Sequence, residues 1–288
     1  MSEPLVGALE LASELDGVAP PAVLDASLVL HTAAFDGDYR KESGRGRWLE
    51  AHLPRSQHVD VSVQFSDPDA ALHYTHPEPA ALAAALAAIG VAEGRRVVVY
   101  DTTGTLWAAR LWYLLRWIGV DVRVLDGGLD AWTAAGLPVR RGEEPADSPV
   151  PAWPASEVRE AWIDQRELLA RADDDIRPLV CGLPAAQFTG SAPTRYSRRG
   201  RIPGSVNVSS RDLFGPDGRL LPPAELLAAH LAAGIEPGES EVLLYCGGGI
   251  SASANALALA VLGVDAVRIY DGSLEEWSAD PALPLLVG

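Results

Sequence analysis

Residues 241–263 read EVLLYCGGGISASANALALAVLG: an apolar run, a cysteine with three glycines, and a second apolar run. The first run, 242–245, predicts a short buried strand. The second, 251–262, is rich in Ala and Leu and predicts a helix that ends near Gly263. Ligands bind beyond the carboxyl ends of the strands in open α/β sheets, so Cys246 stands where a functional group is expected.

The same pattern occurs a second time, at 97–139, and indicates an internal repeat. Five pairs of residues share a spacing of 145 positions: Tyr100 and Tyr245, Gly104 and Gly249, Asp126 and Asp271, Gly127 and Gly272, Trp132 and Trp277. Gly119 and Gly263 lie 144 positions apart, so one small insertion is needed and is then compensated. We therefore expect two homologous domains of about equal size.

Each half of the chain is expected to fold as strands that alternate with helices. The predicted strands are 97–100, 122–125, 242–245 and 266–269, and the predicted helices are 78–89, 106–118, 223–233 and 251–262. This alternation predicts an α/β fold in which each domain has a mostly parallel sheet with helices on both faces. Prolines and charges replace the hydrophobic pattern between the halves, so we place the domains at 1–140 and 161–288 and a linker at 141–160.

The composition narrows the possible functions. Of the 288 residues, 48% are hydrophobic, which excludes a wholly disordered chain. The net charge of −16 repels nucleic acids and anionic membrane surfaces, so neither is an expected partner. The first residues lack the basic start of a signal peptide, and no apolar run is long enough to span a membrane. Two cysteines suit neither a disulfide framework nor a metal site, which favours the reducing cytoplasm.

The residues after Cys246 suit a reactive thiol. Gly247, Gly248 and Gly249 allow the backbone to curl, and the amides up to Ile250 and Ser251 can then point inward. Those amides and the positive end of the following helix stabilise an anion, and a thiolate is the nucleophilic form of cysteine. The alternative is a buried structural cysteine before a glycine-rich turn. The first repeat has Asp101 at this position, so packing alone does not require sulfur there.

Other motifs fit the loop less well. GGGISA (247–252) matches the dinucleotide-binding fingerprint, but that motif is weak by itself. The lysine of a phosphate-binding P-loop is absent from the loop. A cysteine phosphatase would need an arginine after five intervening residues, and Ala252 stands there. Nucleotide and phosphate-ester chemistry are therefore disfavoured.

Taken together, the motifs resemble the tandem-domain rhodanese family of sulfurtransferases. They are CGGGIS (246–251), RGRIPGSVNV (199–208) and YDGSLEEW (270–277), with degenerate copies AHLPRSQHV (51–59) and LDGGLDAW (125–132). The resemblance implies a catalytically silent first domain and a second domain whose Cys246 thiolate takes the outer sulfur of a donor as a persulfide. The loop amides would hold that sulfur until a thiol or cyanide removes it. No metal or organic cofactor is implied.

The family resemblance also bears on the sulfur donor. Members that prefer thiosulfate carry basic residues after the cysteine, whereas members that prefer 3-mercaptopyruvate have a neutral loop, as here. Gly248 replaces the serine of the mercaptopyruvate pattern, and Gln187 stands where the family usually has a carboxylate-binding arginine. Candidates to compensate for that arginine are Arg195, Arg198 and Arg199. Asp60 and His76, in a polar loop of the first domain, are further candidates for the cleft between the domains.

Alternatives remain open at this level. The chain could be a persulfide carrier that serves a partner enzyme and has little small-molecule turnover, or a rhodanese-like interaction module without catalysis. The acceptor could be a small thiol, cyanide, or a thioredoxin-like or other sulfur-accepting protein. Cys181 is expected to be a buried small residue at a strand end, although a second redox thiol is the alternative. Trp132 and Trp277 are expected to be core anchors, because both repeats keep them.

Overall fold

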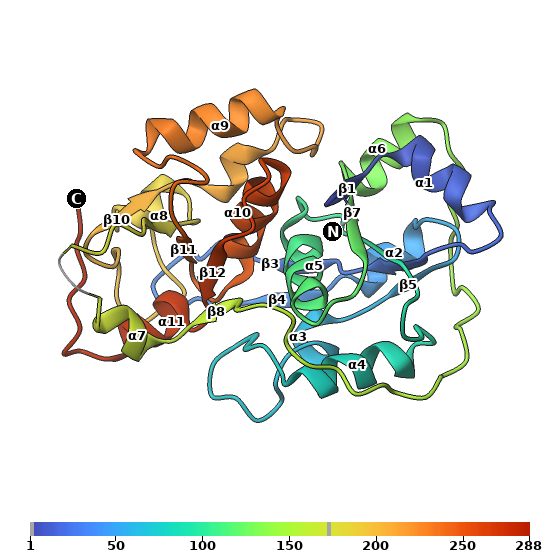
Figure 1. Cartoon of the computed structure of the whole chain (residues 1–288), viewed down its shortest axis with the longest axis horizontal. Helices are drawn as coiled ribbons and strands as arrows, with labels where there is room; N and C mark the ends of the chain where they lie inside the picture. The colour runs from blue at the N-terminus through green and yellow to red at the C-terminus, as the bar shows by residue number, and fades with distance from the viewer. Residues whose placement is uncertain (1–2, 172–173) are drawn as a thin grey trace.

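The computed structural model describes residues 3–171 and 174–288, and it divides them into two similar units that lie side by side (Figure 1). The first unit has a parallel sheet of five strands in the order β1 (Leu5–Val6), β7 (Val122–Leu125), β6 (Val97–Tyr100), β2 (Ala22–Asp25) and β5 (Ser56–His58). The second has the same order in β8 (Trp162–Ile163), β12 (Val267–Tyr270), β11 (Val242–Tyr245), β9 (Leu179–Cys181) and β10 (Ser205–Asn207). The prediction of two homologous α/β domains is confirmed.

Helices connect and cover the two sheets. In the first unit they are α1 (Ala8–Leu15), α2 (Arg45–Glu50), α3 (Val61–Gln64), α4 (Pro79–Ala88), α5 (Leu106–Trp117) and α6 (Gly128–Ala134). In the second they are α7 (Gln165–Leu169), α8 (Ala185–Phe188), the 3-10 helix η1 (Ser210–Leu213), α9 (Pro223–Ala232), α10 (Ile250–Val261) and α11 (Ser273–Ala279). A small antiparallel ribbon, β3 (Leu28–Leu30) and β4 (Lys41–Ser43), completes the first unit. The predicted strands and helices differ from these by one or two residues at most.

The central strands and helices explain why the halves form one molecule. All four residues of β6 and of β11 are buried, as expected for parallel strands covered on both faces. Helices α5 and α10 are buried over most of their length and pack against each other at the junction of the two units (Figure 1). The core therefore continues from one domain into the other through this helix pair.

The repeat extends to individual hydrogen bonds. The Tyr100 hydroxyl lies 3.1 Å from Ser56 Oγ, and the Tyr245 hydroxyl lies 2.7 Å from Ser205 Oγ. In the same way Trp132 Nε1 donates to a proline carbonyl at 2.8 Å, and Trp277 Nε1 donates to another at 2.9 Å. The two tryptophans are only 2% and 3% exposed, which confirms them as core anchors.

The structure corrects one detail of the repeat alignment. Helices α5 and α10 both have twelve residues, and each follows a left-handed residue, Thr105 (φ 67°) or Gly249 (φ 79°). The first helical hydrogen bonds also correspond, from Ala109 N to the Thr105 carbonyl and from Ser253 N to the Gly249 carbonyl. Gly249 therefore matches Thr105 rather than Gly104, and the extra residue of the first domain lies inside its loop.

The segment 141–160 has no helix or strand and is held along the first domain. Val150 N donates to the carbonyl of Ala87 in α4, and Val158 N donates to the carbonyl of Trp117 in α5. Trp153 packs against the core. The connection between the domains is therefore attached to the first domain by hydrogen bonds and packing.

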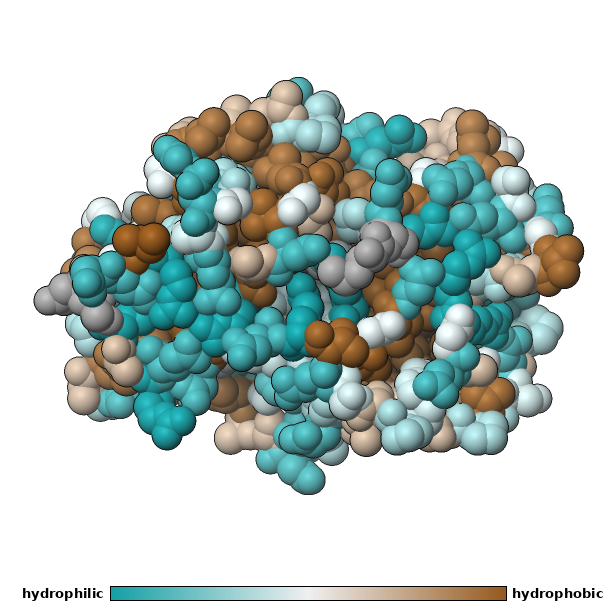
Figure 2. All heavy atoms as spheres, in the orientation of Figure 1, coloured by the Kyte–Doolittle hydropathy of each residue, from teal (hydrophilic) through white to brown (hydrophobic). Residues whose placement is uncertain are grey.

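The face of the molecule drawn in Figure 2 is mostly polar, with local apolar areas. Figure 2 shows apolar side chains gathering over α9, where Leu227 and Leu231 are exposed. Within residues 3–171 and 174–288, no helix combines the length and the apolar character that crossing a bilayer demands.

Candidate active site

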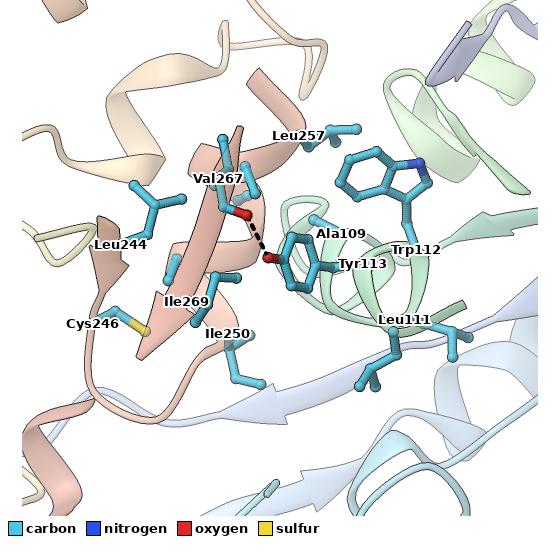
Figure 3. Close-up of a cluster of buried hydrophobic side chains, with 14 of the residues drawn as sticks. Ala109, Leu111, Trp112, Tyr113, Leu244, Cys246, Ile250, Leu257, Val267 and Ile269 are labelled. Carbon is cyan, nitrogen blue, oxygen red and sulfur yellow. Dashed lines mark hydrogen bonds between the residues drawn. The ribbon is translucent and has the colours of Figure 1, made fainter. Parts of the chain in front are cut away.

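Cys246 directly follows β11 and is 2% exposed (Figure 3). It lies at the wall of a cleft of about 460 Å³ to which both domains contribute. Residues of the first domain that line the cleft include Leu30, Tyr39, Tyr74, Leu106 and Trp107. Residues of the second domain include Gln187, Arg195, Tyr196, Arg211, Glu275 and the loop residues Gly247, Gly248, Ile250 and Ser251. The cysteine thus faces a space large enough for a small substrate.

The loop after Cys246 is tied to the start of α11. Ser273 Oγ accepts hydrogen bonds from Cys246 N at 3.1 Å and from Gly249 N at 3.3 Å, and donates to the Tyr270 carbonyl at 2.7 Å. The next amides of α11 donate back to the loop, from Leu274 N to the Cys246 carbonyl at 3.2 Å. These bonds fix the curvature that the glycines permit.

The corresponding loop of the first domain shows what this backbone geometry can bind. The Asp101 carboxylate, at the position of Cys246, accepts hydrogen bonds from four backbone amides at 2.7–2.9 Å: Thr103, Thr105, Trp107 and Ala108. The last two amides belong to the first turn of α5, where amides have no partner within the helix. The loop therefore surrounds a negative charge with N–H donors.

The same reasoning applies to the loop of the second domain. Because α10 begins 144 residues after α5, its amides at Ser251 and Ala252 correspond to the two helical donors to Asp101. They too lie in the first turn, before the first helical bond at Ser253. The arrangement suits a thiolate or a bound sulfur anion at Cys246.

The three candidate arginines have different surroundings. Arg195 lines the cleft, donates to the His31 carbonyl, and has a buried Nε with no partner among the described residues. Arg198 instead donates to backbone carbonyls around the end of α11, including Ser278 at 2.9 Å and Asp280 at 2.6 Å. Arg199 pairs with Asp36 of the first domain at 2.8 Å. Arg195 is therefore the one of the three that is placed to meet a ligand.

The two candidates from the first domain lie outside the cleft lining. Asp60 is the N-cap of α3, where its carboxylate accepts the Ser62 amide at 2.9 Å. The His76 ring stacks on Trp162 with 4.3 Å between ring centroids, and burial lowers its pKa. Asp60 is thus a helix cap and His76 makes a buried contact between the domains, and neither lines the cleft. The reason is that the polar loop folds onto the second domain beside the cleft.

A neighbouring histidine, His73, contacts a residue of the cleft lining. His73 Nδ1 lies 2.5 Å from a carboxylate oxygen of Glu275, which lines the cleft. The His73 ring also stacks on Tyr39, with 4.2 Å between centroids. The sequence contains both histidines three positions apart, and only the fold of the loop distinguishes them. Glu275 belongs to the repeat motif YDGSLEEW (270–277), and its place in that motif is the sequence feature that could have indicated it.

Behind the active-site loop lies an ion pair between the domains. Arg110 of α5 is fully buried, and its Nη1 lies 2.8 Å from Asp271 Oδ1. A Cβ on Gly249 would come within 2.5 Å of that carboxylate oxygen, so only glycine fits there. Asp271 Oδ2 also accepts the backbone amide of His76 at 2.8 Å. The first domain thus supports the loop from behind.

Cys181 has the surroundings of a structural residue. It is fully buried at the end of β9, next to Tyr245 in the parallel register. Burial raises the pKa of its thiol to about 12, so the thiol is neutral at physiological pH. Within the described part of the chain, no three His, Cys, Asp or Glu side chains gather closely enough to hold a metal ion.

Comparisons with known proteins agree with this geometry. The family model for the rhodanese-like domain matches residues 30–135 and 190–280. The chain is 31% identical to the 3-mercaptopyruvate sulfurtransferase of Escherichia coli K12, over 83% of this chain and 84% of that protein. It is 32% identical to thiosulfate/3-mercaptopyruvate sulfurtransferase 1 of Arabidopsis thaliana, over 82% of this chain and 67% of that one.

The fold is similar to that of a solved relative. The crystal structure of SseA from Escherichia coli, a 3-mercaptopyruvate sulfurtransferase, superposes with a TM-score of 0.78 and 28% identity. The match covers 94% of this chain and 99% of SseA, so both domains and their relative arrangement are shared.

Proposed function

This chain belongs to the rhodanese family of sulfurtransferases, and we propose that it transfers sulfur from 3-mercaptopyruvate to a thiol or cyanide through a persulfide on Cys246. The observation that supports this most is the position of Cys246, in a loop whose counterpart surrounds the Asp101 carboxylate with four amides. A thiolate and a persulfide anion both gain from such donors.

The reaction has two displacements. The Cys246 thiolate attacks the sulfur of mercaptopyruvate, an S–S bond forms and the C–S bond breaks. The bonding electron pair leaves with the carbon as the enolate of pyruvate, which takes up one proton. An acceptor thiolate then attacks the outer sulfur of the persulfide, breaks the S–S bond and restores the Cys246 thiolate. No cofactor enters either step.

The charges of the cleft support mercaptopyruvate over thiosulfate. No side chain of the loop from Gly247 to Ser251 is positive, so a doubly charged anion has no counter-charge next to the sulfur. The Glu275 carboxylate also lines the cleft and disfavours such an anion. Mercaptopyruvate carries a single carboxylate set back from its sulfur, and Arg195 is the proposed clamp for it.

A carrier function is the second candidate, and Gln187 is the observation that favours it. Gln187 lines the cleft where the family usually has an arginine, so small donors would be held less tightly. A lost charged hydrogen bond costs about 1.5–3 kcal/mol, or roughly ten- to a hundredfold in binding. In that case a thioredoxin-like or other sulfur-accepting protein of the cytoplasm would be the partner.

The test is a kinetic comparison of the two donors with cyanide and a thiol as acceptors. We expect a higher kcat/KM with mercaptopyruvate, and a mass gain of one sulfur atom on Cys246 when the acceptor is left out. Cys246→Ser should abolish both signals without unfolding the protein, since the first domain folds with Asp101 at this position. Turnover by Cys246→Ser would exclude the mechanism, and protein-delivered sulfur without small-molecule turnover would support the carrier.

The carboxylate clamp can be tested with a matched pair of variants. Arg195→Ala should raise the KM for mercaptopyruvate about ten- to a hundredfold. Arg198→Ala serves as the control, because its guanidinium holds backbone carbonyls outside the cleft lining and its loss should lower stability instead. An unchanged KM in Arg195→Ala would contradict the clamp.

A further inference from the structure

We propose that Tyr74, a side chain of the catalytically silent domain, donates a hydrogen bond to the keto oxygen of a 2-keto-thiol donor such as mercaptopyruvate. This inference rests on the proposed function and assigns a second substrate contact in the same cleft. It makes the first domain a contributor to the chemistry rather than only a scaffold.

The first observation is an unpartnered hydroxyl in the cleft. Tyr74 lines the cleft that Cys246 faces, yet the residue is only 5% exposed. Its hydroxyl oxygen is buried and has no hydrogen-bond partner within residues 3–171 and 174–288. The Tyr39 phenol is close enough to affect its ionisation, but the geometry falls short of a hydrogen bond. A buried hydroxyl without a partner is costly, and a ligand oxygen would satisfy it.

The second observation is how firmly the side chain is positioned. Tyr74 has a backbone φ of 61°, in the left-handed region that non-glycine residues seldom adopt. Its carbonyl accepts a hydrogen bond from Arg110 Nη2 at 2.7 Å, and its ring meets the edge of Trp107 with 5.0 Å between centroids. Strained residues that are held from several sides tend to occur at functional sites. These contacts hold the Tyr74 side chain fixed in the lining of the cleft.

The third observation concerns the protonation state. Burial raises the pKa of Tyr74 to about 12, and the nearby charge of Glu275 acts in the same direction while Arg195 opposes it. The phenol therefore stays protonated during turnover and keeps the O–H that can donate to a substrate oxygen. When sulfur leaves mercaptopyruvate, the electron pair of the broken C–S bond moves toward the keto oxygen, which becomes the enolate oxygen. A fixed donor at that oxygen stabilises the transition state more than the ground state.

The choice of the keto oxygen follows from the other groups in the cleft. The carboxylate of the donor needs a cation, and Arg195 is the proposed clamp. The sulfur must reach Cys246 and its loop amides. The keto oxygen is the remaining polar atom of such a donor, and a neutral hydroxyl suits an oxygen whose charge develops only during the reaction.

The experiment compares Tyr74→Phe with the unmodified protein for two donors. With mercaptopyruvate we expect kcat to fall about 100- to 1,000-fold, because one donor to the developing oxyanion is lost. With thiosulfate, whose leaving group is sulfite and which has no keto oxygen, kcat should stay within about twofold. The melting temperature should not fall, since the hydroxyl has no protein partner to lose.

Tyr113→Phe is the matched control. Its hydroxyl is also buried between the domains but donates to the carbonyl of Ala161 at 2.7 Å and to that of Val267 at 3.2 Å. Figure 3 shows the bond to Val267. This variant should melt at a lower temperature and keep its kcat with both donors. Equal losses with both donors in Tyr74→Phe, or no loss with either, would overturn the inference while leaving the proposed function intact.

If the unmodified protein forms no persulfide, the proposed function fails, and the role of Tyr74 is then tested by binding alone. Cys246→Ser should bind mercaptopyruvate, and adding Tyr74→Phe should weaken the Kd about tenfold. An unchanged Kd, or no binding by either variant, would overturn the role of Tyr74.

Discussion

Cys181 and Cys246 stand at the ends of neighbouring parallel strands, β9 and β11, but in different surroundings. Cys246 is followed by a loop of backbone amides at the start of a helix, whereas Cys181 is enclosed in the sheet beside Tyr245. In the first domain Asp25 takes the position of Cys181, and burial raises the pKa of its carboxyl as well. Burial at this position of the fold thus raises the pKa of its occupant in both domains.

We therefore expect Cys181→Ser to keep its activity. Its kcat/KM should stay within about twofold of the unmodified value, while burial of a hydroxyl in place of sulfur lowers the free energy of unfolding by about 1–3 kcal/mol. Iodoacetamide labelling followed by mass spectrometry should modify Cys246 and leave Cys181 unreacted in the folded protein. Complete loss of activity in a folded Cys181→Ser variant would place this thiol in the mechanism.

Among the secondary-structure elements, the short helix α11 helps to shape the loop after Cys246. Its first residue, Ser273, supplies the oxygen that binds the amides of Cys246 and Gly249. The matching residue of the first domain is Gly128, whose φ of 54° is close to the 49° of Ser273. The first domain keeps the backbone conformation at this position without the hydroxyl, whereas in the second domain the hydroxyl binds the loop amides.

Ser273→Ala should loosen the loop. The buried amide of Cys246 would lose its acceptor, which costs about 1–3 kcal/mol in the free energy of unfolding, and persulfide formation in a single turnover should slow. Urea unfolding and rapid-quench mass spectrometry measure the two effects. Ser278→Ala is the control in the same helix, because Ser278 Oγ is buried without a partner in the described structure and its loss should cost little. Equal effects of both substitutions would argue against the loop contact.

The sequence predicts the regular elements well because their signals are local. Val242–Tyr245 is a short apolar run of β-forming residues, and Gly263 follows the end of α10 in a left-handed conformation, so each boundary follows from nearby residues. The position of Cys246, between the end of a strand and a glycine-rich turn into a helix, was predictable for the same reason. The pairing of Gly104 with Gly249 was wrong by one residue, because Thr105 adopts a left-handed conformation that the sequence gives no reason to expect.

The side of the cleft built from distant segments was less predictable. The sequence does not distinguish the three arginines of one loop, Arg195, Arg198 and Arg199. In the structure Arg199 pairs with Asp36 and Arg198 binds carbonyls near the C-terminus, so neither faces the cleft. Likewise the conformation of their loop decides that His73 contacts Glu275 whereas His76 stacks on Trp162. These choices depend on contacts between the domains, and no local pattern encodes them.

At the scale of the whole molecule, the two domains support each other in a nearly symmetric way. Asp271 Oδ2 accepts the amide of His76 from the first domain, and Asp126 Oδ1 accepts the amide of Leu220 from the second at 2.9 Å. The two aspartates belong to the same repeat motif. Each domain therefore covers the loop of the other, although only one loop carries a cysteine.

His76 makes the contact between the domains sensitive to pH. Burial lowers its pKa below the ordinary value of 6.5, Arg110 acts in the same direction, and Asp271 and Glu78 oppose the shift. Below pH 6.5 the unfolded chain binds a proton at this residue before the folded chain does, so the free energy of unfolding should decrease as the pH falls.

Replacing His76 by Phe should weaken this dependence, since Phe can stack on Trp162 but cannot bind a proton. Full protonation of one group in the unfolded state alone changes the free energy of unfolding by about 1.4 kcal/mol per pH unit. Urea unfolding at a series of pH values from neutral to acidic measures the slope for both proteins. His230, also buried with a lowered pKa, adds a similar slope to both and does not affect their difference. Parallel pH profiles would show that His76 does not contribute.

The ion pair between Arg110 and Asp271 joins the domains behind the Cys246 loop. Arg110→Met removes a fully buried guanidinium and leaves Asp271 without its counter-charge, which costs about 3–5 kcal/mol in the free energy of unfolding. Because Asp271 lies directly behind Gly249, persulfide formation should slow as well. The double variant Arg110→Met/Asp271→Asn should recover part of the stability, since no buried charge remains unpaired.

Arg116→Met is the comparison, because the Arg116 pair with Asp265 is partly exposed and should contribute at most about 1 kcal/mol. Urea unfolding and single-turnover kinetics of all four proteins complete the measurement. If Arg110→Met were as stable and as fast as Arg116→Met, the buried pair would support neither the domain contact nor the loop. If the double variant regained stability but not rate, the pair would be required for the loop geometry itself, and the first domain would act on catalysis through Asp271 as well as through the cleft.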